Sequence, residues 1–314
     1  MPNRSSARKW SSRIAVRFLF VFMITALLLT AGCSRNKGVK EYLPDFSRGK
    51  LINGALLIPY INASQRAGGL SLEAFHEKIA DVLQNDCKGL KLLTADDPGT
   101  RALMAKLAAY LNNGDIIGFS ETARSAGIAS IVTGRIAEVA ADARSRGLWL
   151  LRDTNYYLTV QVDTTIYDVE TGARTIDVSL TEEVSIDGLE YDAMVLGQPA
   201  ELTHVDKLLD ELAEDSAERS CKALREQPWI GFITAVDKDQ VTLVPGGKAG
   251  LKTGMKLHIY NSGTLLDGAM GHRYFIPGLQ SAAIEIISVN PDTAQARIIT
   301  GSMVSPGDSV RLLD

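Results

Sequence analysis

The chain has 314 residues, 33 of them basic and 37 acidic, with a formal net charge of −4 at pH 7. This balance argues against nucleic acid as a partner, because such binding depends on lysine and arginine that neutralise phosphates. The three cysteines are too few for a disulfide-framework protein, and the length allows two domains with hydrophobic cores.

Residues 1–32 have the pattern of an export signal. Five basic and no acidic residues lie among the first 17, and thirteen uncharged residues follow from Phe18 to Thr30. An export signal needs an apolar region of about 7 to 15 residues, whereas a membrane-spanning helix needs about 20. We therefore expect this segment to be removed, which leaves 28 basic and 37 acidic residues.

A lone cysteine, Cys33, directly follows the small-residue stretch "LTAG" at positions 29–32. This succession resembles the lipobox of bacterial lipoproteins. The resemblance implies cleavage before Cys33 and its acylation, with palmitate among the expected chains, so that the protein is anchored without spanning the bilayer. Ser34 follows, and by resemblance to sorted lipoproteins the absence of aspartate there implies the periplasmic face of the outer membrane. The alternative is a secreted protein in which Cys33 has no role.

Residues 33–50 are polar, charged and without periodicity, and are predicted to form a tether. The 17 residues after Cys33 can extend to about 55 to 60 Å. The folded part is therefore expected to work close to its membrane.

Residues 51–227 are predicted to form an α+β domain, an α/β sandwich with a mixed sheet. Apolar runs at 55–61 and 90–94 indicate strands, and helical periodicity follows a capping serine, Ser71. Two alternating segments joined by "ETG" predict an antiparallel hairpin, since each has one apolar and one polar face. In the first segment the apolar face holds Leu158, Val160, Val162 and Ile166, and the polar face holds Thr159, Gln161, Asp163 and Thr165.

Several segments of this region occur in a characteristic order: "ALLIPYINAS", a helix, "ARSAGIASIVTGRI" and "VQVDTTIYDVETGARTIDVSLTEE". Together they resemble the domain shared by the periplasmic part of the curli secretion channel, the N-terminal domain of the Tol-system propeller protein and the middle domain of flagellar assembly protein T.

Residues 228–314 have short strand-like runs separated by glycine and proline, which predict a small all-β barrel. A "G-x-x-x-G-L-K-x-G" loop and a terminal "G-D-x-V" occur here in that order. Gly246, Gly250 and Gly254 carry the first motif, and Gly307, Asp308 and Val310 carry the second. This half resembles the C-terminal domain of flagellar assembly protein T, and the order of the two halves matches that family.

No constellation for catalysis stands out, and we expect no enzyme activity, cofactor or metal. The histidines, His76, His204, His258 and His272, are widely spaced and have no cysteine or carboxylate at ligand spacing. The stretch "GGKAGLKT" lacks the spacing of a phosphate-binding loop.

Two features are candidates for other roles. The loop 261–280 is long for a barrel connection and carries Leu265, Leu266, Tyr274, Phe275 and Ile276, which either contact a partner or pack over the barrel's own core. Cys87 and Cys221 either form a disulfide or remain two separate thiols.

The resemblance to flagellar assembly protein T implies a structural lipoprotein of the flagellar basal body, with envelope or basal-body proteins as partners and possible assembly into a homo-oligomeric ring. The N-terminal domain of that family is missing here, and a lipid anchor takes its place. A regulator of peptidoglycan synthesis and a subunit of a curli-type export apparatus remain alternatives.

Overall fold

The computed structural model describes residues 51–64, 71–97, 99–147, 153–196, 203–268 and 273–312. Gly49–Asp314 form one compact unit. The expected signal peptide and tether, with Cys33, lie outside the described residues. None of the helices described in this unit is both long and apolar enough to cross a bilayer.

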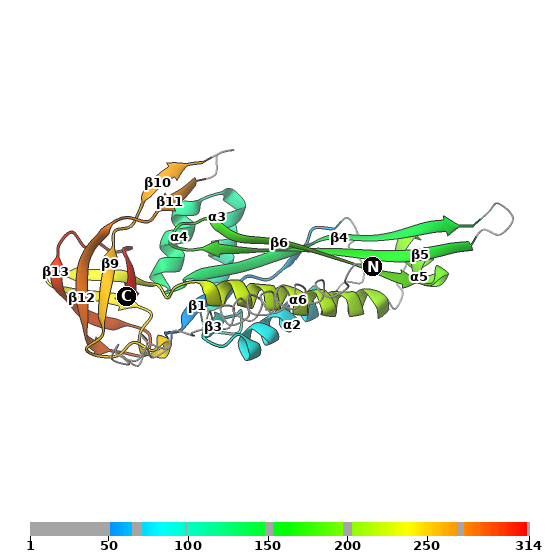
Figure 1. Cartoon of the computed structure of the whole chain (residues 1–314). Helices are drawn as coiled ribbons and strands as arrows, with labels where there is room; N and C mark the ends of the chain where they lie inside the picture. Colours follow the sequence, from blue (N-terminus) through cyan, green and yellow to red (C-terminus); the bar gives the residue numbers. More distant parts are fainter. Residues whose placement is uncertain are drawn as a thin grey trace, which may run out of the picture. The chain divides into compact units, whose positions relative to one another are not determined.

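The first half of the unit is a mixed sheet with helices on its faces, as the α+β prediction requires (Figure 1). The strands are β1 (Asn53–Leu57), β2 (Ile61–Asn62), β3 (Leu90–Leu93), β4 (Ser130–Arg146), β5 (Asp153–Asp168) and β6 (Arg174–Ile186). The helices are α2 (Leu72–Asp86), α3 (Thr100–Asn113), α4 (Ile116–Ser125), α5 (Gly188–Leu196) and α6 (Thr203–Glu226). The sheet order is β3-β1-β4-β5-β6, with β2 also beside β4. Strand β1 pairs in parallel with β3 and β4, and β2 pairs in parallel with β4, whereas the β4–β5 and β5–β6 pairs are antiparallel.

One face of this sheet is covered by α2 and α6. The apolar positions predicted for β5 are fully buried there, together with the apolar stripe of α2. Ser71 begins α2 as expected, because its hydroxyl accepts a hydrogen bond from the Ala74 amide at 3.3 Å. This layer supplies the largest hydrophobic core of the chain's first half.

The opposite face is covered only at one end, by α3 and α4 (Figure 1). Phe119 of α4 packs edge-to-face on Tyr167 of β5, with 5.7 Å between ring centres. Gly127 ends this helical segment at a φ of 70°, where an L side chain would be strained, and lets the chain enter β4. Over the remaining length of β4, β5 and β6, none of the helices described here covers this face, which we call the open face.

Gly134 of β4 lies where the sheet has no room for a side chain. A Cβ atom there would stand 2.2 Å from the ring of Tyr60 and 2.5 Å from the Asp163 carbonyl oxygen. The Tyr60 hydroxyl reaches past it to share a hydrogen bond with Thr164 at 2.8 Å. Glycine is therefore required here by a close approach of ring and backbone.

The second half is a closed barrel, as predicted, with the strand order β12-β13-β8-β7-β14-β9. Its strands are β7 (Gly231–Asp237), β8 (Gln240–Val244), β9 (Lys256–Tyr260), β12 (Gln280–Val289), β13 (Ala294–Gly301) and β14 (Ser309–Leu312), with a short 3-10 turn, η1, at Gly247–Ala249. A separate two-stranded hairpin is formed by β10 (Thr264–Asp267) and β11 (Arg273–Ile276).

The structure explains why the glycine loop and the terminal "G-D-x-V" motif of the barrel need these residues. Gly246 passes so close to the β12–β13 turn that a Cβ atom would lie 2.3 Å from the Thr293 amide nitrogen. The Asp308 carboxylate is buried and accepts from the backbone amides of Ser262 and Ser305 at 2.7 and 2.8 Å. It therefore holds together two loops that are far apart in the sequence.

Helix α5 was not expected from the sequence. Helix α6 runs on past Cys221 to Glu226. Its second half buries small polar side chains: the Ser220 hydroxyl donates to the Ser216 carbonyl at 2.7 Å, whereas the buried Ser216 hydroxyl has no hydrogen-bond partner within the described residues.

Helices α2 and α6 are joined by a disulfide between Cys87 and Cys221, whose Cα atoms lie 5.4 Å apart. This separation lies within the usual range for a bridge. Both cysteines are on helix flanks that meet because the two helices lie side by side on one sheet face. Cys87 is 2% exposed.

Candidate functional site

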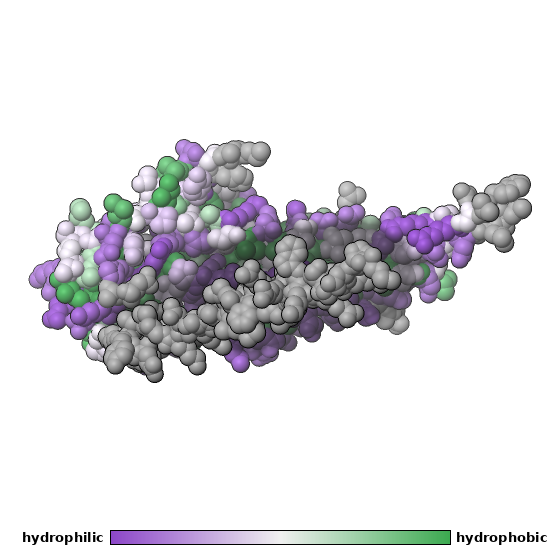
Figure 2. All heavy atoms as spheres, in the orientation of Figure 1, coloured by the Kyte–Doolittle hydropathy of each residue, from purple (hydrophilic) through white to green (hydrophobic). Residues whose placement is uncertain are grey.

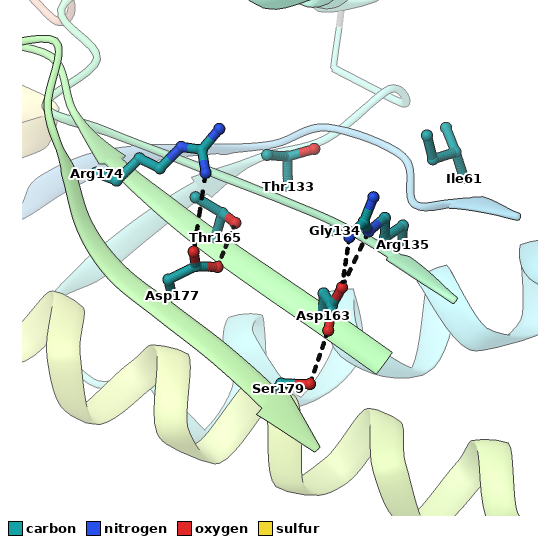
Figure 3. Close-up of a pocket in the computed structure, with 9 residues that line it drawn as sticks. All are labelled: Ile61, Thr133, Gly134, Arg135, Asp163, Thr165, Arg174, Asp177 and Ser179. Carbon is teal, nitrogen blue, oxygen red and sulfur yellow. Dashed lines mark hydrogen bonds and ion pairs between the residues drawn. The ribbon is translucent and has the colours of Figure 1, made fainter. Parts of the chain in front are cut away.

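The open face of the sheet carries a network of polar side chains centred on Asp163 (Figure 3). The register places Arg135 of β4 and Ser179 of β6 on either side of it. Arg135 donates through Nε at 3.0 Å and Nη2 at 2.9 Å, and the Ser179 hydroxyl donates at 2.8 Å. Gln161 adds a fourth hydrogen bond at 3.1 Å. One carboxylate thus ties the three long strands together.

A hollow of about 500 Å³ lies over this network, between the sheet and Ile61 of β2. A second charged pair borders it, since Arg174 lies 3.8 Å from Asp177 and the Thr165 hydroxyl donates to the same carboxylate at 3.1 Å. The two arginines and two aspartates balance in charge. This arrangement suits an uncharged polar partner better than a free ion.

The pKa of Asp163 is lowered by the balance of its surroundings. Burial alone would raise that pKa, but hydrogen bonds from Ser179, Gln161 and Arg135, together with the charge of Arg135, outweigh it. The ionised form is therefore the one that the folded sheet stabilises.

Replacing Asp163 with asparagine is expected to lower the free energy of unfolding at pH 7 by about 1 kcal/mol, because charge-assisted hydrogen bonds across three strands are weakened. Since the folded-state pKa is depressed, this contribution is present above the unfolded value of about 4 and disappears as the pH falls through the folded value. Urea unfolding of both proteins between pH 3 and 7 measures it. A difference that stayed constant over this range would contradict the assignment.

Further along the open face, Arg144 of β4 reaches across to β6. Its Nη1 donates to Glu183 at 2.8 Å, and its guanidinium lies 4.5 Å from the centre of the Tyr157 ring. The hydrogen bond from Arg144 lowers the pKa of Glu183. The polar character of the open face thus continues to the far end of the strands.

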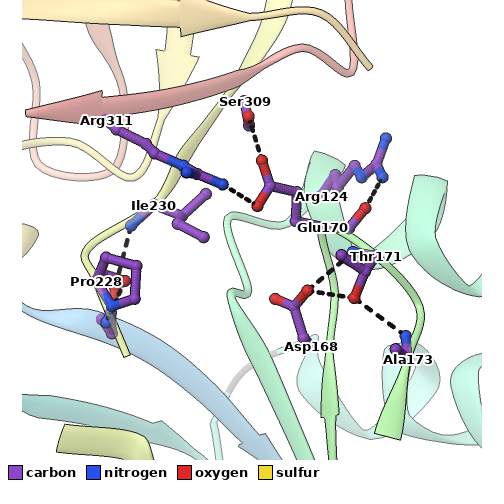
Figure 4. Close-up of polar contacts among 10 residues, drawn as sticks. Arg124, Asp168, Glu170, Thr171, Ala173, Pro228, Ile230, Ser309 and Arg311 are labelled. Atoms are coloured by element: carbon purple, nitrogen blue, oxygen red, sulfur yellow. Dashed lines mark hydrogen bonds and ion pairs between the residues drawn. The ribbon is translucent and has the colours of Figure 1, made fainter. Parts of the chain in front are cut away.

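A second polar cluster joins the sheet to the barrel (Figure 4). Glu170, 7% exposed, follows β5 and accepts from the Ser309 hydroxyl at 2.5 Å and from the Arg311 guanidinium, both in β14. The buried Arg124 of α4 donates to the backbone carbonyl of Glu170 and, at 3.4 Å, to that of Gly307. These contacts fix the barrel against α4 and the β5–β6 turn.

The loop 261–280 forms the β10–β11 hairpin, which stands out from the barrel (Figure 1). The register pairs Leu266 with Tyr274 and Thr264 with Ile276, so these four residues share one face of the hairpin. Leu266, Tyr274 and Ile276 are 37%, 37% and 46% exposed. Hydrophobic side chains are visible at this surface in Figure 2.

The other face of the hairpin turns toward α4. The Phe275 ring lies 5.0 Å from the Arg124 guanidinium, and the Phe275 amide donates to the Thr171 carbonyl at 2.7 Å. Phe275 and Leu265 are half-buried. The hairpin therefore does not pack over the barrel's own core, and its outer face is available to a partner; the partner contact itself stays a prediction.

The other predicted site residues are placed as follows. Cys33 and His272 lie outside the described residues. His204 contacts Glu190 at 2.6 Å, whereas His76 and His258 each have a buried ring nitrogen with no hydrogen-bond partner among the described residues. Among the residues that the structure describes, no group of three or more His, Cys, Asp or Glu side chains is placed to hold a metal ion.

The partners of two residues could not be predicted from the sequence. Asp163 was expected on a polar face, but nothing in the sequence indicated Arg135 as its partner, because a bulge at Ile136–Glu138 shifts the register between β4 and β5. The burial of Glu170 was not expected either, since it depends on Ser309 and Arg311 about 140 residues away. Only the charged pattern "DVETG" marked that turn.

Comparisons with known proteins give no family assignment. No family model and no curated protein matches the chain. Solved structures that align with it include a hypothetical protein from Chlamydia trachomatis, at 12% identity over 56% of this chain and 99% of that one, with a TM-score of 0.31. Lipoproteins from Neisseria meningitidis and Acinetobacter baumannii align at 12% identity over 54% of this chain and 99% and 93% of theirs, with TM-scores of 0.27 and 0.28. Bacterial lipoproteins are therefore among its structural neighbours, but scores at this level carry no inference about function.

Proposed function

We propose that this chain is a lipid-anchored envelope protein with a structural role in assembly, on the periplasmic face of the outer membrane, and that it serves the flagellar basal body. The observation that carries the assembly role is the outer face of the β10–β11 hairpin. It presents Leu266, Tyr274 and Ile276 to solvent, although the same hairpin is held firmly on its other side by Phe275 and Arg124.

An apolar face on a braced hairpin is a rigid surface for a protein partner. Contiguous exposed apolar patches often mark interaction sites on soluble proteins, and preorganised surfaces bind with less loss of conformational entropy. The flagellar assignment is supported by the resemblance of both halves to flagellar assembly protein T, through the glycine loop and the buried Asp308.

The membrane anchor makes the first prediction from this proposal. Replacing Cys33 with serine is expected to shift the protein from the membrane fraction to the soluble periplasmic fraction, because the acyl chains supply the membrane affinity. Fractionation and immunoblotting measure the change, with Ser34→Thr as the matched control. A processed protein found in the inner membrane would contradict the outer-membrane assignment.

Gene deletion then tests the role. We expect loss of motility, with cell-wall sensitivity and amyloid export unchanged; either of the other two phenotypes alone would point to the peptidoglycan or curli alternative instead. Complementation with Leu266→Ser combined with Ile276→Ser should fail to restore motility although the protein remains folded and anchored. Exposed Ile287→Ser on β12, 37% exposed, is the control that should complement.

A further inference from the structure

The long edge strand β6 is the strongest remaining surface feature of the described residues. It forms one end of the sheet order and, among the described strands, pairs with β5 alone, so no described strand pairs with the other side of its thirteen residues. Proteins usually protect such an edge with proline, charged side chains (lysine above all), a bulge, a short strand or a covering element. The strand Arg174–Ile186 contains neither proline nor lysine, and its charged residues are one arginine and three acids.

We propose that β6 pairs antiparallel with β6 of a second copy of this chain, so that the two sheets join across a twofold axis at Val178. In an antiparallel pair, directly opposed residues share a face, and the pairing register decides which side chains meet. An axis at Val178 places Ile176 opposite Leu180 of the second copy and Asp177 opposite Ser179. Both are favourable or neutral pairs.

Neighbouring pairing registers bring less favourable side chains together. An axis at Asp177 would place the two copies of Asp177 opposite each other. An axis at Leu180 would place Asp177 opposite Glu183 of the second copy. An axis at Ser179 would oppose Ile176 to Glu182, an apolar side chain to an acid. Like charges directly opposite each other destabilise a strand pair, so the acids of β6 leave Val178 as the acceptable centre among these positions.

Helix α6 supplies an independent argument for the same axis. It lies beneath the strands, and its inner flank is fixed toward α2 by the Cys87–Cys221 bond and by the ion pair between Glu214 and Lys78 at 3.8 Å. At about 100° per residue, Asp215 and Arg219 lie about 100° and 140° from Glu214, on the flank away from α2. Both side chains are exposed and neither has an ion-pair partner within the described part of the chain.

A twofold axis near Ala217 would bring Asp215 of one copy to Arg219 of the other, twice. The two centres lie at a similar height along the sheet. Val178 pairs through Thr164 with Gly134, which is four residues, or about 13 Å, from Ser130. Ala217 lies ten residues, or about 15 Å at the helical rise, from Gln227, whose side chain is hydrogen-bonded to Ser130. Strand register and helix charge therefore point to one closed dimer, with the same surface on both copies.

Cysteine cross-linking in membranes that carry the full-length protein tests the strand pairing. Val178→Cys is expected to give a reducible covalent dimer, because opposed Cβ atoms lie about 5 Å apart across an antiparallel pair. Thr181→Cys is the matched control, since the same register separates the two copies of that residue by about 20 Å. Thr181 is the more exposed of the two, so random collisions would favour the control. Absence of the Val178→Cys dimer, or an equal yield from Thr181→Cys, would overturn the proposal.

Charge reversal tests the helix contact. Arg219→Asp is expected to weaken dimerisation of the detergent-solubilised protein about tenfold, measured by light scattering over a concentration series, since two ion pairs become two repulsions. Adding Asp215→Arg should restore it, which loss of folding would not allow. A monomeric wild-type protein would refute the dimer. A double variant that dimerises as weakly as the single variant would refute the helix contact. Neither result depends on the motility assay.

Discussion

Breaking the Cys87–Cys221 bridge is expected to lower the free energy of unfolding by about 4 to 5 kcal/mol. The bridge closes a loop of 134 residues, and in the chain-entropy model a loop of that size restricts the unfolded chain by this amount before any strain is subtracted. The bond also holds α2 and α6 together on the sheet face that contains the main core. Urea unfolding of the wild-type protein with and without reductant measures the loss.

The matched variant is Cys87→Ala with Cys221→Ala, which should be as unstable as the reduced wild type and should not respond to reductant. This comparison separates the bond from the packing of Cys87, because the reduced wild type keeps both sulfur atoms in place. Labelling of two thiols in the unfolded, unreduced protein would show that the bridge does not form. An equal stability of oxidised and reduced wild type would refute its proposed effect.

Periodicity in the sequence was sufficient to predict the sheet and the barrel. The alternation around Val160 and Val162 predicted a strand with one buried face, and the same pattern in the next segment predicted its antiparallel neighbour. Short-range chemistry was equally informative at Ser71, because a helix cap depends on neighbours only a few positions away.

Long-range pairing could not be predicted in the same way. To predict the contacts on the open face, one must know the register of β4 against β5. One bulge in that pair decides whether Arg135 lies beside Asp163. That register leaves no periodic signal in the sequence.

The division of the chain into two domains at Pro228 stays a prediction, but the contacts show how firmly the two halves are connected. Ile230 and Phe232, at the start of the barrel, are buried in the same cluster as Phe119 of α4 and Ile131 of β4. The Asn53 side chain accepts from the Ile230 amide at 3.3 Å and donates to the Pro228 carbonyl at 3.1 Å. The hydrophobic contacts are therefore accompanied by polar ones, of which the cluster around Glu170 is the most buried.

Replacing Glu170 with alanine is expected to destabilise the protein by about 2 to 3 kcal/mol, less than for a fully buried ion pair, because the Arg311 side chain left behind is 31% exposed. Arg311 would lose its carboxylate while its Nε atom is already buried without a hydrogen-bond partner. Ser309 would lose its acceptor as well. Glu170→Gln keeps the size of the side chain and an acceptor for Ser309, so it should cost less than the alanine variant.

A double-mutant cycle with Arg311→Ala distinguishes the ion pair from general packing. Glu170→Ala leaves the Arg311 guanidinium without its carboxylate. Arg311→Ala leaves the Glu170 carboxylate, which is only 8% exposed, without its guanidinium. The double variant leaves neither charge. The double variant is therefore expected to be less destabilised than the sum of the two singles by about 2 kcal/mol or more, within the range found for coupled residues. Denaturation followed by the fluorescence of the barrel's buried Trp229 reports the transition. Strict additivity would mean that Glu170 and Arg311 stabilise the chain independently, and that the junction of sheet and barrel depends on the apolar cluster around Phe232 instead.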